Sequence, residues 1–119
     1  MPPNLMIVDD SRAIVRALEM HFSENGYNVL TASDGFSALE LMRTNMPDVV
    51  ILDIRMPGMD GIAAVKKIRS ADPQAKIIMC SAMGQKTMVL EAMEAGAANF
   101  IVKPFDKEKV VETVRKTLG

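Results

Sequence analysis

The stretch VVILDIRMPGMDG at residues 49–61 determines the fold that we predict for this chain. Its first part, residues 49–53, is apolar on both alternating faces until it reaches Asp53. A strand that is apolar on both faces is typical of a parallel sheet that helices cover on both sides. The Pro57-Gly58 pair predicts a loop shortly afterwards. We therefore expect Asp53 at the carboxyl end of a buried strand.

Four more short apolar runs alternate with segments of helical period. The further strands are expected at residues 5–8, 28–32, 76–81 and 100–102. The first helix is expected to begin near Ser11, a good cap residue, with Ile14, Leu18 and Phe22 on one face. Further helices are expected at 37–44, 62–70 and 86–95 and around Val110 to Leu118. This alternation predicts an α/β protein with a doubly wound parallel (βα)5 sheet.

The composition is that of one small soluble domain covering residues 1–119. Hydrophobic residues make up 49% and charged residues 24% of the chain. A formal net charge of −1 offers no broad basic surface for nucleic acid or for a membrane, and no apolar run is long enough to span one. The start of the chain lacks a signal peptide pattern, so we expect a cytoplasmic protein. The single cysteine, Cys80, is expected to be a buried structural thiol.

Polar residues stand where the predicted strands end. Asp9 and Asp10 follow the first strand, Asp53 ends the third, Ser81 ends the fourth and Lys103 follows the fifth. Ligand sites of doubly wound sheets lie beyond the carboxyl ends of the strands. We therefore expect these five side chains to converge at one edge of the sheet.

Three carboxylates brought close together repel one another unless a cation relieves the repulsion. Oxygen ligands with room left for water favour Mg²⁺ over zinc. A magnesium ion beside a carboxylate, a lysine and a hydroxyl group indicates phosphoryl chemistry, in which Asp53 is the natural nucleophile.

Four motifs of this chain resemble the receiver domains of two-component response regulators. They are LMIVDDS at residues 5–11, VVILDIRMPGMDG at 49–61, CSA at 80–82 and FIVKPF at 100–105. The run from residue 80 to 105 is most similar to chemotaxis receivers of the CheY type found outside enteric bacteria. The resemblance implies a flavodoxin-like fold with strand order 2-1-3-4-5.

The resemblance also implies a role for each site residue. Asp53 would be the phosphoryl acceptor, and Asp9 and Asp10 would form an acidic pocket. The metal would be held by Asp10, Asp53 and the backbone carbonyl of Arg55, and the phosphoryl oxygens by Ser81 and Lys103. Phe100 matches an aromatic switch position where many relatives have tyrosine, although a core phenylalanine is an alternative interpretation. The bond before Pro104 would be a cis peptide.

The implied function is a phosphorylation-dependent switch that catalyses only its own phosphorylation and dephosphorylation. Its partners would be a sensor histidine kinase such as one of the CheA type, an output partner such as a flagellar switch protein, and a phosphatase. The output surface would comprise the fourth helix, fifth strand and fifth helix of a monomer. Residues of the first helix would set partner specificity, namely Arg12, Ala13, Val15 and Arg16. The alternatives are a phosphorelay shuttle or the receiver domain of a larger, for example transcriptional, regulator.

Three other classes of site fit the sequence poorly. Phosphatases of the haloacid dehalogenase type need a second carboxylate two residues after the nucleophile, where this chain has Arg55. A dinucleotide site needs a glycine-rich loop after the first strand, where Asp9 and Asp10 would repel a pyrophosphate. A calcium loop after Asp53 would need oxygen ligands where Arg55 and Pro57 stand.

Overall fold

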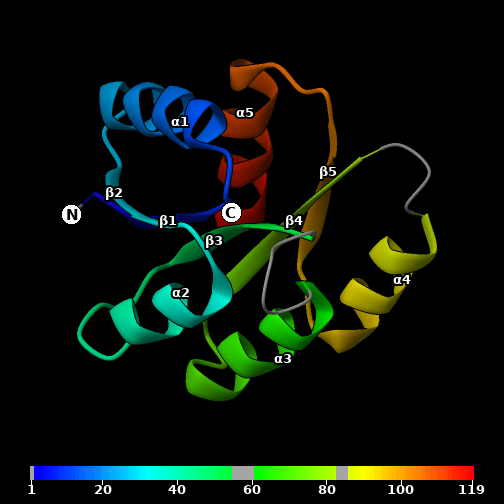
Figure 1. The fold of residues 1–119 in the computed structure, drawn as a ribbon. Helices are drawn as coiled ribbons and strands as arrows, with labels where there is room; N and C mark the ends of the chain where they lie inside the picture. The colour runs from blue at the N-terminus through cyan, green and yellow to red at the C-terminus, as the bar shows by residue number, and fades with distance from the viewer. Residues whose placement is uncertain (1, 55–60, 83–85) are drawn as a thin grey trace.

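The fold consists of a central sheet with helices on both faces (Figure 1). The structure is a computed structural model that describes residues 2–54, 61–82 and 86–119. The strands are β1 (Asn4–Val8), β2 (Asn28–Ala32), β3 (Val49–Asp53), β4 (Lys76–Ala82) and β5 (Asn99–Lys103). The helices are α1 (Arg12–Glu24), α2 (Gly35–Leu41), α3 (Gly61–Ala71), α4 (Lys86–Ala95) and α5 (Lys107–Leu118). Among the described residues, no helix is long and apolar enough to cross a membrane.

All neighbouring strands of the sheet run parallel, in the order β2-β1-β3-β4-β5. This confirms the predicted doubly wound arrangement. The central strand β3 pairs with β1 on one side, where Val8 lies opposite Leu52, and with β4 on the other, where Asp53 lies opposite Cys80. The carboxyl ends of β1, β3 and β4 therefore meet at one edge of the sheet.

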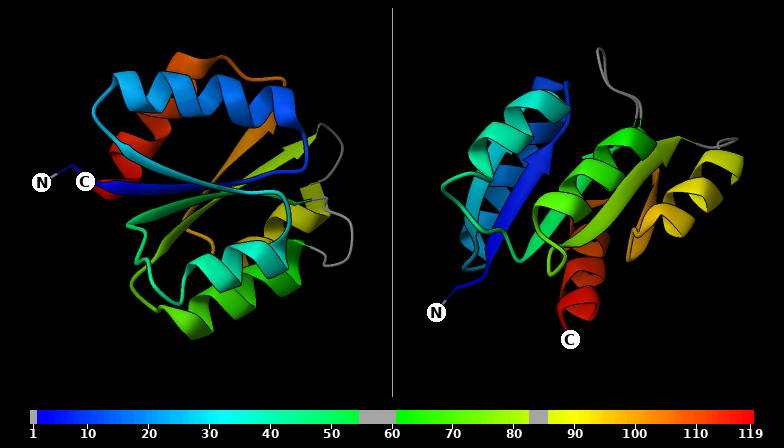
Figure 2. Two further views of the ribbon diagram at one scale, coloured as in Figure 1. Left: turned by 60° about the vertical axis from the view of Figure 1, so that its left-hand side comes forward. Right: turned by 90° about the horizontal axis from the view of Figure 1, so that it is seen from below.

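The sheet separates two hydrophobic cores (Figure 2). On one face, side chains such as Val50, Leu52 and Met79 pack against α2, α3 and α4. On the other, Ile51 and Ile78 pack against α1 and α5. Every residue of β3 is buried, as expected of a strand covered by helices on both faces.

Helix α2 begins and ends earlier than the predicted range of 37–44. Asp34 caps it, because its carboxylate accepts a hydrogen bond of 2.7 Å from the backbone N–H of Ser37. The prediction was wrong because both Asp34 and Ser37 are good cap residues, and the earlier one caps the helix. At the far end the helix stops at Leu41, and the N–H of Asn45 closes a turn on the carbonyl of Leu41.

Helix α4 exposes several of its apolar side chains. Of its residues only Val89 and Ala92 are buried, whereas 57% of Leu90 and 37% of Met93 are exposed. The apolar residues of 86–95 therefore spread over more of the helix than one buried stripe.

Candidate acidic phosphoryl site

Three carboxylates meet at the carboxyl edge of the sheet. Asp9 directly follows β1 and Asp53 is the last residue of β3, so the pairing of these two strands brings them together. One oxygen each of Asp9, Asp10 and Asp53 lies within 4.8 Å of the others. Asp9 and Asp53 are buried, whereas Asp10 is exposed. The expected convergence of the aspartates is therefore present.

Lys103, at the end of β5, reaches into this cluster. Its Nζ lies 3.2 Å from Asp9 Oδ2 and 3.4 Å from Asp53 Oδ2. Partial burial acts to lower the pKa of Lys103, but the carboxylates of Asp53 and Asp9 outweigh it and leave the pKa above its usual value. Lys103 is therefore a positive charge at neutral pH, placed against two buried carboxylates.

Asp9 is oriented by contacts on both carboxylate oxygens. Its Oδ1 accepts a hydrogen bond of 2.9 Å from the backbone N–H of Ser11, and its Oδ2 accepts one from Lys103. Ser11 also caps α1 through its hydroxyl oxygen, which accepts from the N–H of Ile14. From the sequence, Ser11 was expected only as a helix cap. Its backbone contact with Asp9 follows from the turn that leads from β1 into α1.

The remaining predicted site residues differ in their burial and in their distance along the strands from the cluster. Ser81 is buried on β4, one residue beyond the Cys80 that pairs with Asp53. Phe100 lies on β5 three residues before Lys103 and is 44% exposed, so it is not a core residue in this structure. The Lys103-Pro104 peptide bond is cis. Arg55 lies outside the described residues.

Cys80 lies closer to the charged cluster than the sequence indicated. The thiol is buried, as predicted, and burial is the main cause that raises its pKa to about 12. Lys103 lowers that pKa, whereas Asp9 and Asp53 raise it further. The pairing of Cys80 with Asp53 places it under the site. At neutral pH it is therefore an uncharged thiol and a poor metal ligand.

The four charged groups that meet here fit a hard divalent cation. Asp9, Asp10 and Asp53 contribute three negative charges and Lys103 one positive charge, which leaves a net charge of −2 when all four are ionised. Carboxylate oxygens on an exposed edge are ligands that Mg²⁺ prefers, because it retains several waters. Asp10, being exposed, and Asp53 are the side chains that could hold it.

A cavity of about 480 Å³ opens beside the acidic cluster, between α1 and the end of β2. The residues that line it include Asp10, Arg12, Val15, Arg16, Glu19 and Ser33. Three of the four expected first-helix residues, Arg12, Val15 and Arg16, therefore border the acidic pocket. The contributions from Glu19 and Ser33 were not anticipated.

Comparison with known proteins agrees with this geometry. Chemotaxis protein CheY of Bacillus subtilis is 46% identical over 120 residues, covering all of both chains. The solved structure of CheY4 of Vibrio cholerae is 31% identical with a TM-score of 0.92, covering 98% of this chain and 99% of that one. NtrX from Brucella abortus is 30% identical with a TM-score of 0.94, covering 99% of this chain but 27% of that one. The family description "Response regulator receiver domain" matches residues 5–115, and the chain belongs to this family.

Proposed function

We propose that Asp53 accepts a phosphoryl group from a phosphohistidine of a sensor kinase. An oxygen of the Asp53 carboxylate attacks phosphorus, and the bond from phosphorus to the imidazole nitrogen of the donor breaks. The electron pair of that bond remains on the nitrogen, which takes up a proton from solvent. The observation that carries this proposal is the meeting of Asp9, Asp10 and Asp53 against Lys103 at the carboxyl edge of the sheet.

The other site residues would then stabilise the transferred group. Lys103 is close enough to Asp53 to contact a phosphoryl oxygen bound there, and Ser81 would donate a hydrogen bond from β4. Asp10, Asp53 and the backbone carbonyl of Arg55 would hold Mg²⁺. The bound ion supplies positive charge against the phosphoryl oxygens. Asp9 keeps Lys103 in place through their ion pair.

The output of the switch would be the surface beside β5. Large apolar side chains are exposed on two elements of the expected output surface, Leu90 and Met93 on α4 and Phe100 and Val102 on β5. Phe100 is part of the strand that carries Lys103, so a movement of Lys103 toward a phosphoryl group would be transmitted along β5. Phe100 has no hydroxyl group, and the change would be read from the burial of its ring alone.

We infer that the protein is a cytoplasmic chemotaxis regulator of the CheY type, with a receiver domain over residues 1–119. The proposal is supported by the identity with the CheY of Bacillus subtilis over the full length of both chains. Its partners would be a chemotaxis histidine kinase and a flagellar switch protein. The match to a part of NtrX keeps the receiver domain of a longer regulator as the second candidate.

Intact-protein mass spectrometry with acetyl phosphate and Mg²⁺ tests the chemistry. The wild type should gain one phosphoryl group that is labile in base, and Asp53→Asn should gain none. Glu24→Gln is the matched control, since Glu24 is an exposed carboxylate at the far end of α1. A wild type that stays unmodified, or a variant that is modified equally, would contradict Asp53 as the acceptor.

Complementation tests the chemotaxis role. A Bacillus subtilis strain lacking its own CheY should recover expansion in soft agar with the wild-type chain, but not with Asp53→Asn. Recovery in both cases would contradict a phosphorylation-dependent role. If the wild-type chain accepts a phosphoryl group from acetyl phosphate but does not restore expansion in soft agar, the result would instead favour the receiver domain of a longer regulator.

A further inference from the structure

The cavity between α1 and the end of β2 is continuous with the acidic cluster. Asp9 and Asp10 line the cavity and also form the cluster with Asp53. Its volume of about 480 Å³ is within the range of cavities that hold small molecules. A molecule whose phosphoryl group is bound at Asp53 could therefore extend its remaining atoms into this cavity.

One wall of the cavity is a face of α1 that carries two arginines. Arg16 lies four residues after Arg12, and Glu19 three residues after Arg16, so the three side chains share one face of the helix. Both arginines are exposed, and neither forms an ion pair or a side-chain hydrogen bond with any described residue. Both guanidinium groups are therefore available to a ligand that enters the cavity.

Arg12 stands where a positive charge is unfavourable for the helix itself. It is the first residue of α1, whose first turn contains no acidic residue, and the dipole of a helix disfavours cations at this end. Arg12 and Arg16 also repel each other, because like charges four residues apart destabilise a helix. A residue that opposes local stability in this way is typical of a binding site.

The charge of the cavity depends on the metal site. Three acidic and two basic side chains line it, which leaves a net charge of −1 when all are ionised: Asp9, Asp10, Glu19, Arg12 and Arg16. A divalent cation held by Asp10 would reverse the sign of this charge. An anionic group would therefore enter the cavity more readily once the metal site is filled.

We propose that this cavity receives the carboxylate leaving group of small acyl phosphates, and that Arg12 selects such donors. The inference rests on the proposed function of Asp53. When an oxygen of Asp53 attacks the phosphorus of acetyl phosphate, the bond from phosphorus to the acyl oxygen breaks and its electron pair stays on that oxygen. The guanidinium group of Arg12 would stabilise the negative charge that develops there through charge-assisted hydrogen bonds.

A donor with a nitrogen leaving group would gain nothing from Arg12. The leaving nitrogen of phosphoramidate carries a positive charge in the donor. It keeps the electron pair of the bond to phosphorus and leaves as neutral ammonia, so no negative charge develops on it. Arg12 would therefore distinguish donors by the charge of their leaving groups.

Binding of acetylphosphonate tests the cavity without phosphoryl transfer. This analogue has a carbon–phosphorus bond where acetyl phosphate has the oxygen–phosphorus bond that breaks. In the presence of Mg²⁺, a titration followed by NMR should move the Nε–Hε signal of Arg12 to saturation. Without Mg²⁺ the Kd should be about ten-fold higher, because the cavity is then negatively charged. An analogue that does not bind, or that binds without moving this signal, would overturn the proposal.

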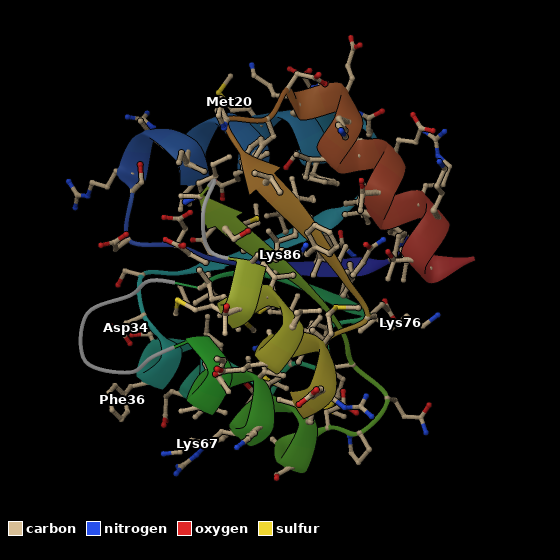
Figure 3. The ribbon with its side chains drawn as sticks, turned by 90° about the vertical axis from the view of Figure 1, so that its right-hand side faces the viewer. Met20, Asp34, Phe36, Lys67, Lys76 and Lys86 are labelled. Atoms are coloured by element: carbon tan, nitrogen blue, oxygen red, sulfur yellow. The ribbon has the colours of Figure 1, made fainter. Side chains whose placement is uncertain are left out.

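Variants at Arg12 test its part in binding. Arg12→Ala should raise the Kd of acetylphosphonate about ten-fold, whereas Arg12→Lys keeps the charge and should retain most of the affinity. Lys67→Ala is the control, because it removes one positive charge from an exposed residue of α3 that points away from the body (Figure 3). Unchanged affinity in Arg12→Ala would overturn the role of Arg12.

Rates of phosphorylation by two donors test the selection. Time courses by intact-protein mass spectrometry should show that Arg12→Ala reacts about ten-fold more slowly with acetyl phosphate but nearly unchanged with phosphoramidate. An equal loss with both donors would indicate a structural effect on Asp53 and would overturn the selection. A wild type that takes up no phosphoryl group from either donor would contradict the proposed function, while the acetylphosphonate titration still decides the cavity.

Discussion

The ammonium group of Lys103 lies 3.4 Å from an oxygen of Asp53, the proposed phosphoryl acceptor. The same nitrogen lies 3.2 Å from Asp9, so one positive charge serves two buried carboxylates. A divalent cation bound to the carboxylates would be repelled by this ammonium group. The positions of Lys103 and of the metal are therefore electrostatically linked.

Lys103→Met should strengthen the binding of Mg²⁺ about ten-fold while it abolishes most of the phosphorylation by acetyl phosphate. A unit charge and a divalent ion roughly 7 Å apart repel by about 1.2 kcal/mol at the dielectric constant of water, about 80, and removal of Lys103 relieves a repulsion of this order. Calorimetric titration with Mg²⁺ measures the affinity. Lys107→Met, at an exposed lysine at the start of α5, is the control. Weaker Mg²⁺ binding in Lys103→Met would show that the lysine supports the metal site instead of opposing it.

Asp10→Asn should stabilise the metal-free protein and remove its response to Mg²⁺. Carboxylates with oxygens within 4.8 Å of one another repel by about 1 kcal/mol even at the dielectric constant of water, and the amide relieves this. Mg²⁺ at a hundred times its dissociation constant should stabilise the wild type by about 2.7 kcal/mol. Urea unfolding followed by circular dichroism, with and without Mg²⁺, measures both effects. A variant that Mg²⁺ stabilises as much as the wild type would show that Asp10 is not a ligand.

The sheet and the edge at which Asp9, Asp53 and Lys103 meet could be predicted from the sequence. The reason is that buried parallel strands are continuous apolar runs, and such runs are visible in one sequence. Parallel strands end at a common edge, so the residues after each run are brought together whatever the loops do. The prediction that these side chains meet therefore required only the positions at which the strands end.

The exposure of Phe100 could not be predicted in this way. Residues 100–102 read as one more apolar run, yet β5 is the edge strand, and α4 leaves the side chains of Phe100 and Val102 partly open. Whether a helix covers an edge strand depends on the tilt of that helix, which is a tertiary property. The position of Lys103 between Asp9 and Asp53 was likewise not visible, because it depends on side-chain geometry.

Gly61→Ala should destabilise the protein more than Gly26→Ala. A Cβ atom on Gly61 would lie 2.6 Å from both Cα and O of Ile54, so the backbone beside Asp53 would have to move, at a cost of about 3 kcal/mol. Gly26 has a φ of +86° but no atom within 4 Å of an added Cβ, so only backbone strain of about 1 kcal/mol is expected. Urea unfolding of both variants gives the comparison. Equal losses would mean that the backbone around Ile54 yields easily.

Cys80 should react very slowly with iodoacetamide in the folded protein. Burial raises the pKa of its thiol from 9.0 to about 12, a difference of three pH units, so the thiolate fraction at pH 8 falls by about a thousand-fold relative to the unfolded chain. Mass spectrometry of the carbamidomethyl product, in buffer and in urea, measures both rates. Comparable rates in the two conditions would show that the thiol is accessible and ionised in the native state.

The raised pKa of Cys80 also predicts that alkali destabilises the fold. Between pH 9 and about 12 the folded state keeps a proton that the unfolded state releases, so the free energy of unfolding falls as the pH rises. From pH 9 to 11 the loss from this one group should be about 2 kcal/mol. Cys80→Ala leaves a small cavity whose cost is the same at every pH. The free energy of unfolding of the variant should therefore be lower than that of the wild type at pH 9, but it should fall less steeply as the pH rises. If the free energy of unfolding falls equally steeply with pH in the variant and the wild type, Cys80 does not cause the alkaline loss of stability. Lys103 would then be the group to test, because its raised pKa acts in the same direction.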